Sequence, residues 1–438
     1  MNILKTLDIH FLEVLRGASV AFVLKGVASV LSFVLNLVLA RMLGADGAGL
    51  YFLSLTVITI VAMLSKVGLD NTFVRFTAGN AIKGDWGAVK GLYRKGMLLT
   101  AAVSLVLTII LFALSPWLAH SVFKDPRLAE PLRWMSLAVA PFALVFLQGQ
   151  ALTGLKKIKE GVALSGGILQ GLTLLGVLIL VPLFAVTGAV VAYALASFVT
   201  LGIGIWLWKR STPDLKGVEG SFPTNRMLAS SIPLFWVAVL NMTLQWSSNL
   251  MLGIWSTSAD VGLYAVANRT SGLVSFILMS VNAISAPKFS EMYSQGDMEG
   301  LGRLARSTAK LMALFASPIV LACVLIPDLV MSIFGAEFTK GGPVLAILGV
   351  GQFVNVITGS VGYLLVMTGQ ERVWRNLMAV SAAMCLALNG LLIPQFGVVG
   401  AAVAMASSLS LLMFLAVYMV WRSLGIVTIP FLPMGRTG

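Results

Sequence analysis

Apolar runs of about twenty residues recur along the whole chain, and this length limits the folds that are open to it. A membrane α-helix needs about 20 apolar residues, whereas a membrane β-strand needs only about ten. Of the 438 residues, 58% are hydrophobic and 11% are charged, which excludes an ordinary soluble domain. The sequence therefore predicts an all-α integral membrane protein. About twelve spans are expected, with the approximate bounds 17–42, 49–71, 96–119, 132–155, 161–184, 188–208, 227–255, 261–287, 304–334, 343–368, 374–394 and 398–421.

Basic residues are concentrated in alternate short connections, which predicts the orientation of the chain. The connections after the second, fourth, sixth and eighth spans are rich in Lys and Arg, and the opposite set holds few. By the positive-inside rule, the basic connections and both termini lie in the cytoplasm. The formal net charge of +13 follows from the same pattern, so no nucleic-acid partner is predicted.

An internal repeat divides the chain into two similar halves. Gly49-Leu50-Tyr51 recurs as Gly262-Leu263-Tyr264 at an offset of 213, and residues 181–192 resemble residues 393–404 at 212. Six spans per repeat place both halves in the same orientation, which predicts two parallel six-helix lobes around a central cavity. The predicted parts are an amphipathic N-terminal segment (1–16), an N-terminal lobe (17–208), a cytoplasmic linker (209–226), a C-terminal lobe (227–422) and a cytoplasmic tail (423–438).

Polar and charged side chains follow single helix faces inside several predicted spans. Those of the first span lie at i, i+4, i+7 and i+11, and those of the seventh at i, i+4 and i+8. A cation in a membrane helix costs about 2.5–3.5 kcal/mol at its centre, so it usually faces a protein interior or a watery cavity. The predicted substrate-binding residues of the cavity are Lys25, Ser29, Ser32, Asn36, Lys66, Asn241, Gln245, Asn249 and Arg269.

Each of these residues also has a purely structural interpretation. Ser, Thr, Asn and Gln can join helices by hydrogen bonds, and this alternative is the commoner one for any single neutral residue. Lys25 can extend to the nearer interface. Lys66 can pair with Asp70, which lies four residues further along the same helix.

The cations favour an anionic headgroup as the ligand, with phosphate as the first candidate. The two cysteines, Cys323 and Cys385, lie in separate apolar runs and lack the spacing of a metal site. There is no GxxxxGK[ST] loop and no Ser/His/Asp arrangement. We therefore predict no metal site, no catalytic residue and no cofactor.

The motifs that carry the repeat resemble those of a known family. Residues 39–44 (Leu-Ala-Arg-Met-Leu-Gly) with Gly49-Leu50-Tyr51, and residues 262–269 with 286–291, are similar to the openings of the two halves of bacterial polysaccharide (O-antigen type) flippases. These flippases belong to the multidrug/oligosaccharidyl-lipid/polysaccharide exporter superfamily. The resemblance covers essentially the whole chain. Three residues in or near its motifs are predicted gating residues, Arg41, Asp70 and Arg75.

The resemblance implies a non-enzymatic transporter with twelve helices that works by alternating access. Its implied substrate is an undecaprenyl-diphosphate-linked oligosaccharide, exported across the bacterial inner membrane for O-antigen and lipopolysaccharide synthesis. The implied partners are the lipid bilayer, this substrate and other polysaccharide assembly proteins. Coupling to an H⁺ or Na⁺ gradient is also implied, although no motif identifies the ion or its residues.

Three alternatives stay open at this point. A multidrug and cation antiporter of the same superfamily usually has an acid in its first helix, where this chain has Lys25. A membrane enzyme acting on lipid-linked sugars usually has a large outer loop, and all outer connections here are short. A channel or scaffold would not require matched lobes with buried charges.

Overall fold

The computed structural model describes residues 2–215 and 217–429, and the side chains of residues 2–22 and 283 lie outside that description. Within this part the chain forms helices and connections only. The helices are α1 (Asn2–Ser65), α2 (Leu69–Ile82), α3 (Trp86–Trp117), η1 (Leu118–Val122), η2 (Pro126–Leu128), α4 (Ala129–Ser136), α5 (Val139–Gly154), α6 (Ile158–Val162), η3 (Ala163–Ile168), α7 (Leu169–Ser211), η4 (Pro213–Leu215), α8 (Thr224–Trp255), α9 (Ser258–Ser271), α10 (Leu273–Ser294), α11 (Met298–Leu325), α12 (Pro327–Ser332), η5 (Ala336–Gly341), α13 (Gly342–Thr358), α14 (Val361–Met367) and α15 (Glu371–Leu424).

Eight helices of the described residues are long and apolar enough to cross a membrane, and three of them contain a sharp break. The breaks are at Gly44 in α1, Ala185 in α7 and Gly397 in α15, so each of these helices holds two spans. One further span is the bent pair formed by Pro126–Ser136 and Val139–Gly154, with an angle of 46°. Counted in this way, the described residues contain the twelve spans that the sequence predicts.

The described chain forms two compact units. Unit 1 holds the chain up to Leu43 together with Leu50–Val239, and unit 2 holds Gly44–Gly49 together with the chain from Leu240 onward. The boundary therefore lies inside α8, beyond the polar linker at 209–226. The amphipathic segment predicted at 1–16 concerns side chains outside the described residues, although the backbone there belongs to α1.

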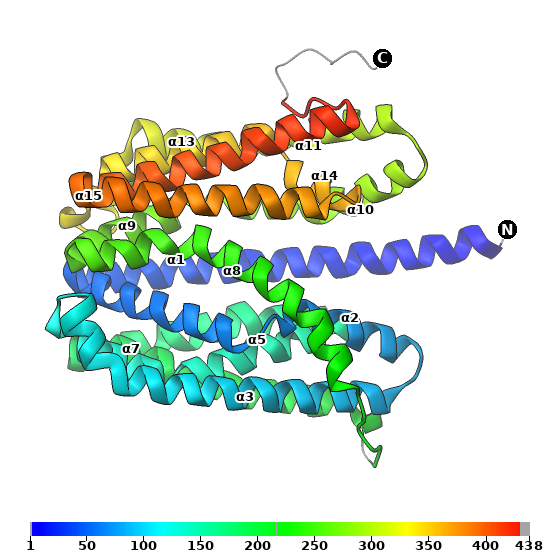
Figure 1. Ribbon diagram of the computed structural model, residues 1–438, viewed down its shortest axis with the longest axis horizontal. Helices are drawn as coiled ribbons and strands as arrows, with labels where there is room; N and C mark the ends of the chain where they lie inside the picture. Colours follow the sequence, from blue (N-terminus) through cyan, green and yellow to red (C-terminus); the bar gives the residue numbers. More distant parts are fainter. Residues whose placement is uncertain (1, 216, 430–438) are drawn as a thin grey trace. The chain divides into compact units, whose positions relative to one another are not determined.

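The same order of helices builds each unit (Figure 1). In unit 1, α5 packs between α3 and α7, and in unit 2, α13 packs between α11 and α15. The core of unit 1 includes Phe73, Leu92 and Leu152, and that of unit 2 includes Phe289, Leu364 and Ala416.

Two breaks show the repeat most directly at the level of the backbone. Ala185 has φ 48° and ψ −128°, and Gly397, which lies 212 residues later, has φ 53° and ψ −128°. A left-handed φ is uncommon for alanine and easy for glycine, so unit 1 keeps a strained residue at this turn. Three residues after each break, a glycine lies close to the backbone of the preceding helix: Gly188 beside Val181, and Gly400 beside Ile393. A Cβ on either glycine would lie 3.0 Å from the amide nitrogen of that neighbour.

The repeated Gly-Leu-Tyr motif marks a close helix crossing within unit 2. A Cβ on Gly49 would collide with the carbonyl oxygen of Ser258, and a Cβ on Gly262 would collide with that of Ala45. The contact is reciprocal, because each glycine packs on the turn that precedes the other. Only glycine lets two helix backbones approach in this way, which explains why the motif occurs in both halves.

The polar linker is held firmly against unit 1. Lys90 of α3 donates hydrogen bonds to the carbonyl oxygens of Leu215 and Val218 at 3.0 and 2.7 Å, and Lys95 donates to that of Phe222 at 2.7 Å. In unit 2, Arg306 of α11 donates to the carbonyl oxygen of Val427 at 2.8 Å. In each unit, therefore, basic residues near the start of the helix that forms the third span (α3 or α11) hydrogen-bond to the segment that follows the sixth span of that unit.

Candidate functional site

The predicted polar line of the first span occupies the first half of α1 in unit 1. Lys25 is exposed, Ser29 and Ser32 are half-buried, and Asn36 is buried with 6% of its surface exposed. The line therefore leads from an exposed cation to a buried amide over about three helical turns. Arg41 is exposed and lies three residues before the break at Gly44.

The predicted line of the seventh span occupies the part of α8 that belongs to unit 2. Asn241 and Gln245 are exposed, and Asn249 is buried with 3% exposure. The Oδ1 atom of Asn249 has no hydrogen-bond partner within the described part of the chain. Asn249 lies 213 residues after Asn36, so both units end their polar line in a buried asparagine. Arg269 is half-buried on α9 of the same unit.

Lys66 is the most deeply buried cation of the described chain, with 2% exposure. Its Nζ lies 2.9 Å from Oδ2 of Asp70 and 3.8 Å from the centre of the Phe146 ring. This is the pairing that the sequence offers as the structural alternative for Lys66. A buried charge persists only when it is paired and hydrogen-bonded, and the cation–π contact adds to that compensation. The other oxygen of Asp70, Oδ1, has no hydrogen-bond partner among the described residues.

The backbone beside this ion pair is strained and tightly packed. Val67 has φ 49°, a conformation that is a genuine outlier for a β-branched residue, and Gly68 follows with φ 72°. A Cβ on Gly68 would lie 2.6 Å from the amide nitrogen of Phe235, so only glycine allows α8 to approach here. Arg75, five residues beyond Asp70 on α2, is exposed and lies over Phe76, with 5.4 Å from Cζ to the ring centre.

Unit 2 contains a neutral polar cluster of Ser247, Cys385 and Asn389, all fully or nearly buried. The Nδ2 atom of Asn389 donates to Sγ of Cys385 at 3.3 Å and to Oγ of Ser247 at 3.4 Å, and Ser247 and Cys385 are 3.5 Å apart. Among the described residues Oδ1 of Asn389 has no partner. Uncompensated polar oxygens in a buried site can accept hydrogen bonds from water or a ligand.

Sequence reasoning missed three residues of these two sites. Phe146 carries no signal, because an aromatic residue in an apolar span is ordinary. Asn389 is a single amide in an apolar run, four residues after Cys385, and this spacing was the available signal. Ser247 lies between Gln245 and Asn249 in the sequence but on a different face of the helix, so the i, i+4, i+8 pattern does not include it.

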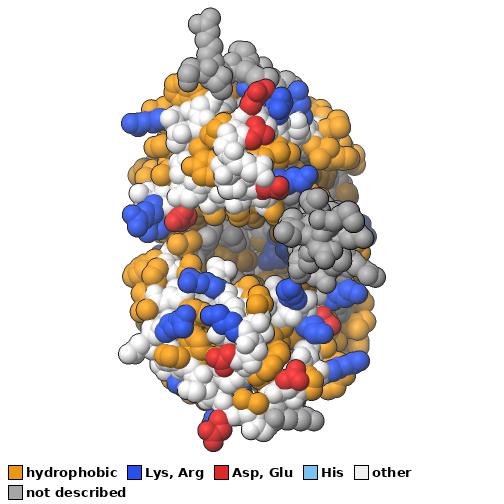
Figure 2. Space-filling view, turned by 90° about the vertical axis from the view of Figure 1, so that its right-hand side faces the viewer, with side chains coloured by type: hydrophobic (Ala, Val, Ile, Leu, Met, Phe, Trp, Pro, Cys, Tyr) orange, Lys and Arg blue, Asp and Glu red, His pale blue; other side chains and the backbone are white. Residues whose placement is uncertain are grey.

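The space-filling view shows where charged side chains gather on one face of unit 1. The lower part of Figure 2 looks onto the end of unit 1 that carries the α2–α3 connection, where Lys and Arg side chains gather. Within the described residues, no group of three or more His, Cys, Asp or Glu side chains is arranged so that it could hold a metal ion.

Comparison with known proteins gives a consistent result. Residues 14–293 match the model of a family described as polysaccharide biosynthesis protein. The chain is 24% identical over 376 residues to a probable low-salt glycan biosynthesis flippase, Agl15, of Haloferax volcanii, with 83% of this chain and 78% of the relative covered. It is also 26% identical over 140 residues to stage V sporulation protein B of Bacillus subtilis, which covers 32% of this chain and 26% of that relative.

Solved structures share the fold at low sequence identity. The lipid II flippase MurJ in an inward closed conformation aligns with a TM-score of 0.74 and 13% identity, over 91% of this chain and 86% of that one. An inward-facing multidrug resistance transporter of the MATE family aligns with a TM-score of 0.74 and 16% identity, over 92% and 98%. Both have the fold of the multidrug/oligosaccharidyl-lipid/polysaccharide (MOP) superfamily. The chain belongs to the polysaccharide biosynthesis protein family, and it is a multi-pass membrane protein.

Proposed function

We propose that the protein moves an undecaprenyl-diphosphate-linked oligosaccharide across the bacterial inner membrane for the synthesis of a surface polysaccharide. Membership of the polysaccharide biosynthesis protein family supports a sugar-bearing substrate. The relative from Haloferax volcanii is described as a flippase for glycan biosynthesis, and the structural neighbour MurJ as a lipid II flippase. Both descriptions name a flippase, and a lipid-linked sugar is the substrate class that we infer from them; both termini lie in the cytoplasm in this proposal.

The observation that carries the proposal is the placement of one cation in an apolar helix of each unit. Lys25 lies on the first span of unit 1 and Arg269 on the second span of unit 2. A charged residue in a membrane span is costly and is retained for a function. Cationic side chains bind phosphate by charge-assisted hydrogen bonds, so a diphosphate headgroup is a ligand suited to each of these residues.

The neutral side chains of the same helices supply a second kind of contact. Asn36, Gln245 and Asn249 offer amide donors and acceptors, which suit the hydroxyl groups of a sugar. We assign contacts with the anionic headgroup to Lys25 in unit 1 and to Arg269 in unit 2, because each is a cation within an apolar span. The two units then move relative to each other so that the substrate is exposed to one side at a time, with an H⁺ or Na⁺ gradient as the source of energy.

A multidrug antiporter is the second candidate, because the MATE transporter shares this fold over nearly its whole length. A cationic drug would be repelled by Lys25 and Arg269, whereas an anionic headgroup would be attracted. The charge of these two residues therefore favours the lipid-linked substrate.

Complementation tests the proposal in cells. A strain that lacks its own polysaccharide flippase is given the wild-type chain, Lys25→Ala, Lys25→Arg, Lys25→Gln or Arg269→Ala, and surface polysaccharide is measured beside membrane protein level. The neutral variants should reach the membrane, because removing an intramembrane charge lowers the cost of insertion. Export should fall sharply in Lys25→Ala and Arg269→Ala, and Lys25→Arg should retain more export than Lys25→Gln. Wild-type export by well-expressed alanine variants would contradict the proposed headgroup site.

A further inference from the structure

A groove of ≈ 250 Å³ lies at one end of unit 1, where α2, α5 and α7 end and α3 begins. Its wall includes the apolar side chains of Ile82 and Trp86, and its polar lining residues are Lys156, Lys157 and Ser211. No described residue that lines this groove is acidic. The groove therefore combines an apolar wall with a net positive charge.

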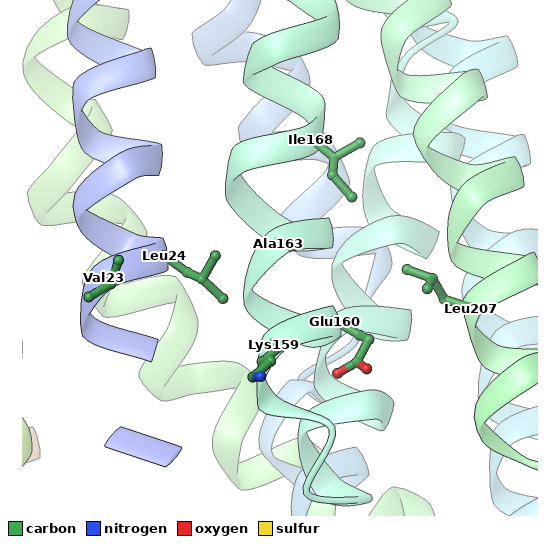
Figure 3. Close-up of a pocket in the computed structure, with 7 residues that line it drawn as sticks. All are labelled: Val23, Leu24, Lys159, Glu160, Ala163, Ile168 and Leu207. Atoms are coloured by element: carbon green, nitrogen blue, oxygen red, sulfur yellow. The ribbon is translucent and has the colours of Figure 1, made fainter. Parts of the chain in front are cut away.

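The larger groove of unit 1 has a different balance of charge. It measures ≈ 630 Å³ and lies between the first half of α1 and the segment that runs from α6 into α7. Figure 3 shows Lys159 and Glu160 on the segment that faces Leu24 of α1. A lysine and a glutamate together give this lining no net charge. The larger groove is therefore not expected to select an anion, whereas the smaller one is.

The two lysines of the smaller groove lie on a turn that occurs in both units. The amide of Lys156 donates to the carbonyl oxygen of Thr153 at 3.0 Å, and the amide of Lys157 donates to that of Leu152 at 2.9 Å. The same two bonds recur 213 residues later, at 3.2 and 2.8 Å. Both turns are the Schellman ending of a helix, in which the residue after the C-cap is left-handed and is usually glycine. The two units therefore share the backbone of this turn.

The side chains on this turn differ between the units. Unit 2 has Gly369 with φ 79°, followed by Gln370, whereas unit 1 has Lys156 with φ 60°, followed by Lys157. A left-handed φ is easy for glycine and strained for lysine. Backbone strain of this kind is concentrated at functional sites. Unit 1 therefore places a strained cation where unit 2 has the residue that suits the backbone.

The groove lies at the level where the apolar helices of unit 1 end. Helix α5 ends at Gly154, two residues before Lys156. Close to the end of α7, Trp206 is exposed, and the Cζ atom of Arg210 lies 5.3 Å from the centre of its ring. Trp and extended Arg side chains at the end of a span are typical of the membrane interface. Lipid headgroups are therefore expected at the groove, beside Ile82, which has 78% of its surface exposed.

We propose that this groove binds the phosphate of an anionic phospholipid of the bilayer. Lys156 and Lys157 supply charge-assisted hydrogen bonds to the phosphate oxygens, and the hydroxyl of Ser211 can donate one more. Ile82 and Trp86 contact the glycerol and the first carbons of the acyl chains. Basic pockets between membrane helices bind anionic headgroups by the same combination of charge and position.

A phospholipid fits the groove better than two other anions. A free phosphate would leave the apolar wall in contact with water. A lipid diphosphate that carries an oligosaccharide is too large, because the volume lies below the range of ligand pockets, about 300–1,000 Å³. The site is therefore separate from the proposed transport site, and it does not rest on the proposed function.

Photolabelling with a phosphatidylglycerol that carries a photoreactive group near its phosphate tests the site. Purified protein is reconstituted in phosphatidylcholine nanodiscs, and the label should appear in peptides that contain residues 78–86 or 154–158. Lys156→Gly combined with Lys157→Gln gives unit 1 the turn of unit 2. The apparent affinity at these peptides should then fall at least about fivefold, which is the effect of one lysine near an anionic membrane surface.

Further variants separate the lost charge from a loss of folding. Lys288→Gln combined with Lys310→Gln removes two exposed lysines of unit 2 and should leave labelling at the groove unchanged. The variant with the turn of unit 2 should unfold close to the wild-type temperature, because the strain that glycine relieves offsets the entropy that it adds to the unfolded chain. Lys157→Gln alone keeps the original turn and should weaken labelling as well. Wild-type affinity in both variants of the turn would overturn the inference.

Competition distinguishes the possible sources of the phosphate. Unlabelled phosphatidylglycerol should displace the label, whereas inorganic phosphate and an undecaprenyl-diphosphate-linked oligosaccharide at the same concentration should not. Displacement by inorganic phosphate would identify a site for a soluble anion. Displacement by the lipid-linked oligosaccharide would assign the groove to the transport path. Either result would overturn the phospholipid site and leave the proposed function standing.

Discussion

Unit 1 and unit 2 share a backbone plan and differ in the polar groups that they bury. Unit 1 buries the ion pair of Lys66 and Asp70 beside a strained turn, and residues 278–283, the corresponding stretch of unit 2, contain no charged residue. Unit 2 buries the cluster of Ser247, Cys385 and Asn389, where unit 1 has Val34, Thr173 and Val177 at offsets of 212–213.

This difference indicates a division of tasks between the repeats. The positions that both units keep include glycines and backbone turns, which determine how closely helices approach, and the buried asparagines Asn36 and Asn249. Other buried polar side chains differ between the units, and such groups are costly to retain without a function. The shared glycines and turns therefore maintain the common fold, and the buried polar groups that differ are the positions at which the units can contribute differently to transport.

The largest effect is expected at the crossing of the repeated Gly-Leu-Tyr motif. Gly49→Leu and Gly262→Leu each force a side chain into an opposing backbone carbonyl, so both should prevent folding and abolish export. Gly202→Leu is the control, because a Cβ there meets nothing within 4 Å. Membrane protein level and detergent-extracted monomer are the readouts. A folded, active variant at either motif position would show that the crossing is not essential.

The next effect separates the two interpretations of Lys66. Lys66→Met leaves Asp70 without its partner and should destabilise the protein by about 3 kcal/mol. This value is at the low end of the range for buried ion pairs because Asp70 is partly exposed. Lys66→Met combined with Asp70→Leu should recover most of that stability, as measured by thermal unfolding in detergent. If the double variant recovers both stability and export, the ion pair has a structural role alone. A stable double variant without export would assign it to transport.

A smaller effect is expected in the neutral cluster of unit 2. Asn389→Val, which introduces the residue found at Val177 of unit 1, removes two hydrogen bonds and should cost about 1–3 kcal/mol. Val177→Asn should cost a similar amount, because it buries an amide in an apolar site. Reduced export by a stable Asn389→Val protein would support a role of the cluster in transport. Wild-type export by Asn389→Val at the wild-type protein level would show that the cluster contributes to packing alone.

The smallest effect concerns the contacts that hold the segments after the sixth and twelfth spans. Lys95→Ala and Arg306→Ala each remove a hydrogen bond from a charged side chain to a backbone carbonyl, at Phe222 and Val427. Both contacts are partly exposed, so each should cost about 1 kcal/mol or less. Proteolysis of the segments at 212–223 and 425–429 should become faster in the matching variant alone. Equal protection in both variants would show that the buried Phe222 and Ile426 hold these segments.

The spans and the repeat could be predicted from the sequence because the membrane imposes length and hydropathy on every helix. The breaks at Gly44, Gly68 and Gly397 are at glycines, yet the turns at Val67 and Ala185 use residues that give no warning of a left-handed backbone. The ion pair of Lys66 was predictable as an alternative because its partner is four residues away.

Contacts between distant segments could not be predicted in the same way. Phe146 meets Lys66 across 80 residues, and Asn389 meets Ser247 across 142. Their positions depend on how α5 packs on the turn before α2, and on how α15 packs on α8. The periodicity of a single helix carries no information about such packing.

Translocation by purified protein in liposomes tests the central claim most directly. Undecaprenyl-diphosphate-linked oligosaccharide is incorporated on one leaflet, and its appearance on the other is measured with an impermeant lectin or glycosidase. The account predicts transfer by wild type, and loss of transfer at normal reconstitution level in Lys25→Ala and Arg269→Ala. Transfer at the wild-type rate by both variants, or no transfer by wild type under either an H⁺ or a Na⁺ gradient, would contradict it.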